Sequence, residues 1–273
     1  MTVTEHTPVQ VTESFVDHPQ GRLFVRSWDS EAGARDAAGL APVLLLHDSL
    51  GCVELWRDFP AALAQALGRR VIAYDRLGFG RSDPRHGALD PTFIEEEALT
   101  VLPVLQRELG FRRFVAFGHS VGGGMAVHCA ALHSGDCVAL VTESAQAFVE
   151  ERTRAGILEA KAGFRDPAQF ARLARYHGDK ARWVLDAWTE TWLGPAFAAW
   201  SLDGVLPRVR CPLLALHGEH DEFGSLRHPE TLARFAAGAA RVEVIAGAFH
   251  IPHREQEGLV LRHVRDFLSP LRA

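Results

Sequence analysis

The chain has 273 residues, of which 47% are hydrophobic and 23% are charged, and its net charge is −5. This composition is typical of a globular domain and excludes disordered, collagen-like and coiled-coil chains. The acidic balance argues against a nucleic-acid partner, and no apolar run approaches the ~18 residues of a membrane-spanning helix. We therefore expect one or two domains with a large buried core, and neither nucleic acid nor a membrane as partner.

The N-terminus and the cysteines indicate a cell compartment. Residues 1–14 are polar and include Glu5 and Glu13, whereas a signal peptide has a basic start and an apolar stretch. The four cysteines show no CxxC spacing, and a chain of this size does not need disulfides for stability. We expect a protein of the reducing cytoplasm, and the sequence leaves a homodimer open.

Short apolar runs alternate with stretches of helical spacing, which predicts a mostly parallel sheet flanked by helices. Residues 22–28 are expected to form an antiparallel edge strand. The remaining strands are expected at residues 42–47, 70–75, 114–118, 137–142, 211–217 and 242–246. The apolar periodicity predicts helices at residues 56–67, 93–109, 125–133 and 255–268.

This alternation stops between residues 146 and 207, where no strand is predicted. Four of the six tryptophans fall in this stretch, namely Trp183, Trp188, Trp192 and Trp200. Any one of them is most simply a packing residue, but together they also suit a helical lid with an apolar underside. We expect an α/β core formed by residues 1–145 and 208–273, and a helical cap formed by residues 146–207.

The pentapeptide Gly118-His119-Ser120-Val121-Gly122 fits the pattern G-x-S-x-G between a predicted strand and a predicted helix. A sharp strand-to-helix turn strains the backbone and crowds the chain around the serine, so glycine is needed where a Cβ would clash. Such a turn presents Ser120 Oγ at the C-terminal edge of the sheet and directs the Val121 N–H toward a developing oxyanion. We therefore predict that Ser120 is a nucleophile.

A serine hydroxyl needs a base that is held in place by a third group. Asp221 follows the strand expected at 211–217, and His250 follows the strand expected at 242–246. Because parallel strands end at the same edge of a sheet, both side chains are expected to meet Ser120 there. His250 is then the predicted base, and Asp221 is the group that orients it.

Other interpretations of these residues are weaker. Glu222 remains an alternative to Asp221 as the third member of the triad. His119 is expected to point away from the pocket and to serve packing. One set of side chains could be imagined as a metal site: His217, His220, His250 and His253, with Glu219 and Asp221. Such a site is disfavoured because no HExxH or comparable ligand spacing is present.

The chain resembles the α/β-hydrolase fold superfamily from about residue 22 to residue 268. The resemblance rests on five motifs in the family order: HDSLG at 47–51, DRLGFGRS at 75–82, GHSVG at 118–122, GEHD at 218–221 and HIPHRE at 250–255. It implies that the Ser49 N–H is the second oxyanion donor and that residues 146–207 occupy the position of the family's cap. It also implies no metal and no cofactor.

Two positions depart from the family pattern. Asp48 stands where the first turn has its second glycine, and aspartate tolerates the left-handed backbone that such a turn can require. A carboxylate directed inward would oppose an oxyanion. Phe249 stands before His250 where many relatives have glycine, and it is expected to narrow the pocket. The segment Ser49-Leu50-Gly51 is similar to the 3-oxoadipate enol-lactonase subgroup, which makes a lactone substrate credible.

The sequence thus predicts a serine hydrolase that cleaves a carboxylic ester or lactone with Ser120, His250 and Asp221, and with Ser49 and Val121 as oxyanion donors. The serine in the elbow argues against the haloalkane dehalogenase and epoxide hydrolase branches, which use aspartate there. A C–C bond hydrolase and an acyltransferase or perhydrolase remain open because they share the triad. A ligand receptor on the same scaffold is a further alternative.

Overall fold

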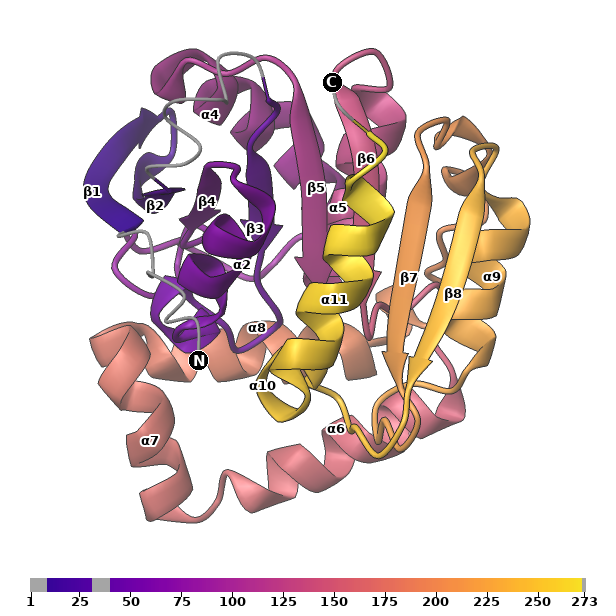
Figure 1. The fold of residues 1–273 in the computed structure, drawn as a ribbon. Coiled ribbons are helices and arrows are strands. Elements are labelled where there is room, and N and C mark those ends of the chain that lie inside the picture. Colours follow the sequence, from indigo (N-terminus) through magenta and orange to yellow (C-terminus); the bar gives the residue numbers. More distant parts are fainter. Residues whose placement is uncertain (1–8, 31–39, 272–273) are drawn as a thin grey trace, which may run out of the picture.

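An eight-stranded sheet forms the centre of the computed structural model, which describes residues 9–30 and 40–271 (Figure 1). The strand order is β1-β2-β4-β3-β5-β6-β7-β8, and every neighbouring pair from β4 to β8 in this order is parallel. The strands are β1 (Val9–His18), β2 (Gly21–Ser30), β3 (Val43–Leu46), β4 (Val71–Tyr74), β5 (Phe114–His119), β6 (Cys137–Glu143), β7 (Leu213–Gly218) and β8 (Ala240–Ile245). The mostly parallel sheet that the sequence predicts is confirmed.

Two antiparallel strands extend the sheet at one side, where the sequence predicts one. β2 pairs with β4 in the expected direction, but β1 pairs with the outer side of β2 and forms the edge. β1 escaped prediction because polar side chains dominate it and Val16 is its one buried residue. Residues 1–8 of the polar N-terminal segment lie outside the described residues.

Helices cover both faces of the sheet. One face packs against α2 (Phe59–Leu67) and α11 (Glu257–Leu268), and the other packs against α4 (Leu102–Leu109), α5 (Val121–Leu132) and α9 (Arg227–Phe235). The sequence did not predict α9. Short elements complete this part of the chain: a 3-10 turn (Val53–Trp56) before α2, a second 3-10 turn (Leu206–Arg208) before β7, and α10 (Pro252–Glu255) before α11.

The helix expected over residues 93–109 is interrupted. It consists of α3 (Phe93–Glu96), a π-helical turn (Glu97–Val101) and α4. Pro103, the second residue of α4, has no backbone N–H to donate to the preceding turn. A regular α-helix therefore cannot continue through this point, and the wider turn accommodates the missing hydrogen bond.

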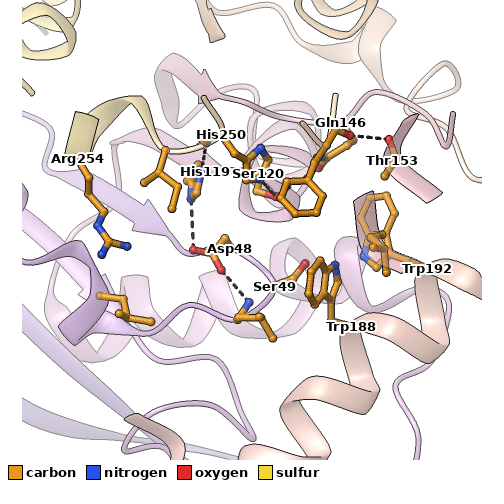
Figure 2. Close-up of a pocket in the computed structure, with 15 residues that line it drawn as sticks. Asp48, Ser49, His119, Ser120, Gln146, Thr153, Trp188, Trp192, His250 and Arg254 are labelled. Atoms are coloured by element: carbon orange, nitrogen blue, oxygen red, sulfur yellow. Dashed lines mark hydrogen bonds and ion pairs between the residues drawn. The ribbon is translucent and has the colours of Figure 1, made fainter. Parts of the chain in front are cut away.

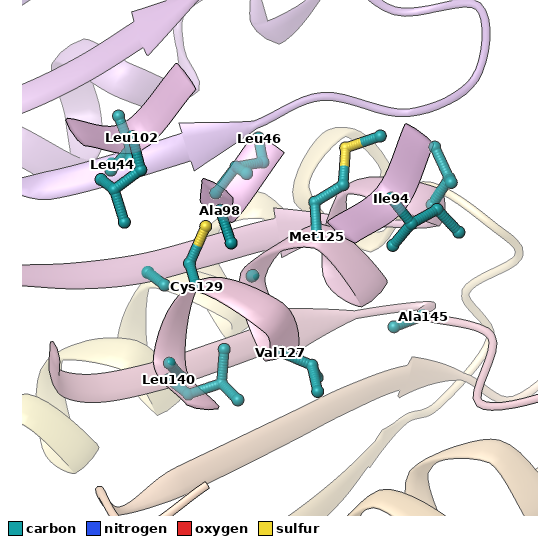
Figure 3. Packing of buried hydrophobic residues seen from close by; sticks show 14 of the residues in the cluster. Leu44, Leu46, Ile94, Ala98, Leu102, Met125, Val127, Cys129, Leu140 and Ala145 are labelled. Atoms are coloured by element: carbon teal, nitrogen blue, oxygen red, sulfur yellow. The ribbon is translucent and has the colours of Figure 1, made fainter. Parts of the chain in front are cut away.

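Helix α5 is buried against the sheet and fixes the position of the residues that precede it. Met125 and Cys129 lie beside Ile94 and Ala98 of the interrupted helix (Figure 3), and all four side chains are at most 1% exposed. A well-packed interior resists displacement of its side chains. The N-terminal end of α5, directly after Ser120, is consequently held in a fixed place relative to the sheet.

The segment between β6 and β7 is helical over most of its length. It contains α6 (Glu151–Gly163), α7 (Pro167–His177) and α8 (Ala181–Leu193), with 3-10 turns at Gly178–Lys180 and Pro195–Phe197. The three helices lie across the C-terminal ends of the parallel strands (Figure 1). Within residues 146–207 the sheet-like pairing is limited to one isolated bridge between Phe148 and Ser201. The division into a core and a cap remains a prediction.

Candidate active site

Ser120 occupies a strained turn between β5 and α5. Its backbone has φ 56° and ψ −125°, a region that side-chain-bearing residues rarely adopt. The turn is held by hydrogen bonds from Ser120 N to Glu143 O and from Gly123 N to Ser120 O. The side chain is 6% exposed and lines a cavity. This is the geometry that the G-x-S-x-G pattern predicts.

The two glycines of this turn are required by close backbone contacts. A Cβ on Gly118 would lie 2.0 Å from Gly122 O, and a Cβ on Gly122 would lie 2.1 Å from Leu46 O. Both distances are far below van der Waals contact, and in each case the obstacle is backbone, which cannot rotate away. The turn therefore packs directly against β3.

We expect Gly122→Ala to lower the free energy of unfolding by at least about 2 kcal/mol, because the methyl group must displace the end of β3. Urea unfolding followed by circular dichroism measures this change. Gly135→Ala is the matched control, since Gly135 is exposed, has no positive φ and has no atom within 4 Å of an added Cβ. Equal stability of the two variants would contradict the packing argument.

The structure brings the three predicted site residues Ser120, His250 and Asp221 together (Figure 2 shows the first two). Ser120 Oγ lies 3.0 Å from His250 Nε2, and His250 Nδ1 lies 2.9 Å from each carboxylate oxygen of Asp221. These contacts span 130 positions of sequence between serine and histidine. They form one continuous hydrogen-bonded chain from a hydroxyl to a carboxylate.

Asp221 is held as a buried carboxylate. It is 1% exposed, and its Oδ1 accepts hydrogen bonds from Phe223 N at 2.8 Å and Gly224 N at 3.1 Å. Burial opposes ionisation, but the adjacent His250 outweighs it and lowers the pKa of Asp221 to about 2. Glu222, the alternative left open by the sequence, is exposed. Asp221 is therefore the carboxylate that contacts His250.

Both predicted oxyanion donors lie beside Ser120. The Val121 N–H is at the N-terminus of α5, where the helix dipole favours negative charge, and Ser49 lines the same cavity as Ser120. Within residues 9–30 and 40–271, we find no hydrogen bond donated by Ser49 N or by Val121 N. Both N–H groups are thus available to a group that binds near Ser120 Oγ.

Asp48 shapes the turn that carries Ser49, but not by a left-handed backbone, since its φ is not positive. Its Oδ1 instead accepts a hydrogen bond from Leu50 N at 2.7 Å, and its carbonyl accepts from Arg76 Nη2 at 2.8 Å. Its Oδ2 lies 3.4 Å from Nδ1 of His119. The carboxylate is therefore paired with a histidine beside the cavity.

His119 does not point away from the cavity, which corrects the expectation from the sequence. Its ring lies between Asp48 and the backbone of His250, with Nε2 2.8 Å from His250 O (Figure 2). Burial disfavours the imidazolium, but Asp48 and then Glu143 overcome this and raise the pKa of His119 to about 9. In the protonated form, both ring nitrogens donate hydrogen bonds, one to each of the two loops.

The raised pKa of His119 makes stability depend on pH in the alkaline range. Below the ordinary histidine pKa of 6.5, the folded and unfolded chains both hold this proton and the stabilisation is complete. It is lost as pH rises from 6.5 through about 9. We expect this loss to amount to about 3 kcal/mol of unfolding free energy, and urea midpoints at several pH values measure it.

Asp48→Asn is the control for this pH dependence, because it removes the anion that keeps His119 protonated. The variant is expected to show a smaller fall in stability between pH 6.5 and 9 than the wild type. Other groups that titrate in this range are common to both proteins and cancel in the comparison. Parallel pH profiles of the two proteins would contradict the assignment.

A second buried pair lies below His119. His253 Nδ1 contacts Glu143 Oε2 at 2.5 Å, and both side chains are at most 3% exposed. His119, Glu143 and His253 together bring three potential ligand atoms within 4.8 Å of one another. This group differs from the metal set considered from the sequence, of which it contains His253 alone. Its members already make hydrogen bonds within the protein.

The cavity at Ser120 has a volume of about 220 Å³ and is largely apolar. Its wall includes Thr153 and Ile157 of α6 and Trp188 and Trp192 of α8 (Figure 2). Thr153 Oγ1 is already bonded to Phe223 O at 2.7 Å. The segment 146–207 thus faces Ser120 with the apolar side of its helices. The other two tryptophans of the segment pack elsewhere, Trp183 against Gly78 and Trp200 against Phe197.

Two residues near the cavity differ from the expectations. Phe249 is 52% exposed and its ring contacts His220, so it does not narrow the pocket. Gln146 was not singled out from the sequence, yet its Oε1 lies 3.5 Å from Ser120 Oγ and its side chain lines the cavity. Its place shortly after the C-terminal end of β6 is the signal that could have identified it.

Comparisons with known proteins agree with this fold. A mouse (Mus musculus) protein, "Serine hydrolase BPHL", is 27% identical over 254 residues, which cover 86% of this chain and 81% of that protein. "Proline iminopeptidase" of Lactobacillus delbrueckii subsp. lactis is 26% identical over 119 residues, or 44% of this chain and 38% of its own. The enol-lactonase from Burkholderia xenovorans LB400 superposes with a TM-score of 0.72 at 22% identity, covering 94% of this chain and 100% of that chain.

The chain belongs to the alpha/beta hydrolase fold family, whose pattern it matches over residues 41–191. The family and the named relatives support hydrolase activity. These relatives include a peptidase as well as serine hydrolases, so the kind of bond that is cleaved does not follow from the family. Among the described residues, no helix combines the length and the apolar character needed to cross a membrane.

Proposed function

We propose that this protein is a serine hydrolase that cleaves a carboxylic ester or lactone. The observation that carries the proposal is the unbroken contact chain from Ser120 Oγ through His250 to Asp221, at the wall of an apolar cavity. A hydroxyl at 3.0 Å from an imidazole nitrogen is within reach for proton transfer. An imidazole oriented by a buried carboxylate is suited to accept that proton.

In the proposed mechanism, Ser120 Oγ attacks the substrate carbonyl while His250 Nε2 accepts its proton. The hydrogen bond from His250 Nδ1 to Asp221 holds the required tautomer and stabilises the imidazolium that forms. The imidazolium then donates its proton to the alcohol oxygen of the ester. When the C–O bond breaks, the acyl group remains bound to Ser120. Water deprotonated by His250 cleaves this acyl-enzyme and restores Ser120.

The oxyanion formed in both steps is proposed to bind the N–H groups of Ser49 and Val121. Donors of this kind act strongly because they are already oriented toward the charge before it develops, and each contributes ~3–4 kcal/mol of transition-state stabilisation. The ion pair of Asp48 with His119 supports this proposal, because it neutralises the carboxylate that would otherwise repel the oxyanion. Gln146 is suited to contact the substrate near Ser120.

The cavity supports a substrate with an apolar group of modest size. Ile157, Trp188 and Trp192 offer an aromatic and aliphatic wall, and a volume of about 220 Å³ suits a small acyl or aryl group. We propose that residues 146–207 act as a cap that contributes this wall. No cofactor takes part in the proposed reaction, and the cytoplasm is the proposed location.

The proposal is tested with p-nitrophenyl acetate, butyrate and octanoate, a simple lactone, and proline p-nitroanilide as an amide comparison. We expect turnover of an ester or the lactone to exceed that of the anilide, with a burst of p-nitrophenol. Mass spectrometry of the quenched protein is expected to find the acyl group on the peptide that contains Ser120. An acyl group elsewhere, or turnover of the anilide alone, would contradict the proposal.

The triad also serves acyl transfer, so the acceptor is measured in the same assay. With methanol or hydrogen peroxide present, product partition separates hydrolysis from transfer to an alcohol or to peroxide. We expect free acid to remain the main product at low methanol concentration. A methyl ester or peracid as the main product would instead identify an acyltransferase or perhydrolase.

A further inference from the structure

Arg254 is the one lysine or arginine among the described residues that line the cavity at Ser120. It belongs to α10, four residues after His250, and Leu55 and Ile251 line the cavity with it. In Figure 2, Arg254 lies on the side of Ser120 opposite to Trp188 and Trp192. The cavity therefore has an aromatic end and a cationic end, with the nucleophile between them.

The guanidinium of Arg254 has no ion pair or hydrogen bond with the described part of the chain, although acidic residues are close. The adjacent Glu255 is occupied by backbone amides, since its Oε2 accepts from Phe249 N at 2.5 Å and its Oε1 from Ile251 N at 3.3 Å. Asp48, the acid in the cavity wall, contacts His119 and Leu50 N. Both neighbouring carboxylates thus favour the charged form of Arg254 from nearby, but their hydrogen bonds and ion pairs are made with other groups.

A second arginine adds to the positive charge at this end. Arg57 lies after the 3-10 turn that precedes α2, and its side chain also lacks an ion pair with residues 9–30 or 40–271. Burial and then the like charge of Arg57 lower the pKa of Arg254, which nonetheless stays protonated as arginines do in proteins. A half-buried cation next to a like charge is unfavourable unless an anion joins it.

We propose that Arg254 binds a carboxylate of the substrate, so that the preferred ester or lactone is an anion with its apolar part toward Trp188 and Trp192. This inference rests on the proposed function, because it names the substrate class of the same site. The planar guanidinium matches a carboxylate with two parallel hydrogen bonds. One free cation in the wall suits a substrate with one negative charge, and it offsets the repulsion expected from a chain of net charge −5.

The test compares esters that differ in one charge. In the first pair the carboxylate is in the acyl part, with mono-p-nitrophenyl adipate against p-nitrophenyl heptanoate. In the second pair it is in the leaving group, with p-acetoxybenzoate against its methyl ester. For each enzyme, kcat/KM for the anionic ester is divided by kcat/KM for the neutral ester. A lower fraction of folded protein in a variant reduces both values equally and does not change this ratio.

In at least one pair, we expect Arg254→Gln to lower this ratio by about tenfold or more, mainly through KM, because a charge-assisted contact is lost. Arg254→Lys is expected to retain part of the preference. Arg262→Gln is the matched control, since it removes the same charge from an exposed position on α11 outside the cavity wall. Unchanged ratios for both pairs in Arg254→Gln would overturn the proposal.

A binding measurement separates this inference from the proposed function. Calorimetric titration with adipate is carried out on the wild type, Arg254→Gln and Arg262→Gln. We expect adipate to bind the wild type and Arg262→Gln, and to bind Arg254→Gln about tenfold more weakly. This result supports the anion site even if no ester is cleaved, whereas equal affinity for all three proteins overturns it even if esters are good substrates.

Discussion

Replacement of Ser120 by alanine is expected to reduce ester turnover roughly 10⁶-fold, to a residual rate that substrate binding and the two oxyanion donors can still support. The effect is this large because the variant has no oxygen at 3.0 Å from His250 Nε2 to attack the carbonyl. Turnover of p-nitrophenyl butyrate at saturation measures it, with active-site concentration taken from the burst of the wild type.

Ser144→Ala is the matched control for this substitution. Ser144 is fully buried, has φ 50° like the φ 56° of Ser120, and its Oγ has no hydrogen-bond partner among the described atoms. Ser144→Ala therefore removes the same hydroxyl group from a residue with a similarly strained backbone, and it leaves the proposed nucleophile in place. Ser144→Ala is expected to keep wild-type turnover, and a loss as large as that of Ser120→Ala would point to a structural cause instead.

Asp221→Asn is expected to lower kcat about 10⁴-fold while the fold is retained. The amides of Phe223 and Gly224 donate to Oδ1, so the asparagine oxygen takes that position and its NH₂ group faces His250 Nδ1. Because the NH₂ group is a donor, Nδ1 must become an acceptor and Nε2 must carry the proton. His250 then cannot accept the proton of Ser120.

The comparison for Asp221→Asn is Glu222→Gln, the same change at the next residue. Glu222 is exposed, and we expect its variant to retain the wild-type kcat. The pKa of Asp221 is lowered to about 2. The ionised side chain therefore stabilises the fold fully above the ordinary carboxylate pKa of 3.8, and this stabilisation is lost as pH falls through about 2. A large loss in Glu222→Gln with little loss in Asp221→Asn would assign the third position to Glu222.

Much of the fold follows from local patterns in the sequence. The strands β3 to β7 are short runs of almost entirely buried residues, which apolar composition reveals without knowledge of their partners. β1 lacks this signal, because it is an exposed edge whose ten residues are held by backbone pairing with β2. The C-terminal end of the helix expected at 93–109 can also be predicted from local residues. The π turn within this helix cannot, because it depends on how Pro103 is accommodated.

The meeting of Ser120, His250 and Asp221 could also be predicted, since each residue lies shortly after the C-terminal end of a strand, and parallel strands end at one edge. Their convergence is therefore a consequence of sheet topology rather than of detailed packing. Gln146 also follows a parallel strand, β6, but it was not predicted because it belongs to none of the sequence motifs. The glycines at 118 and 122 were predicted on steric grounds, and the backbone contacts at 2.0 and 2.1 Å supply the reason.

The sequence by itself determined strands β2 to β8, the serine turn and the order of residues that meet at the sheet edge, because these depend on short-range periodicity and on the direction of the strands. Only the tertiary structure decided which side chains pair across that edge: His119 between Asp48 and His250, Phe249 outside the cavity, and Arg254 without an acid. Such pairings depend on distances of a few ångströms between segments far apart in the chain, and side-chain packing sets those distances.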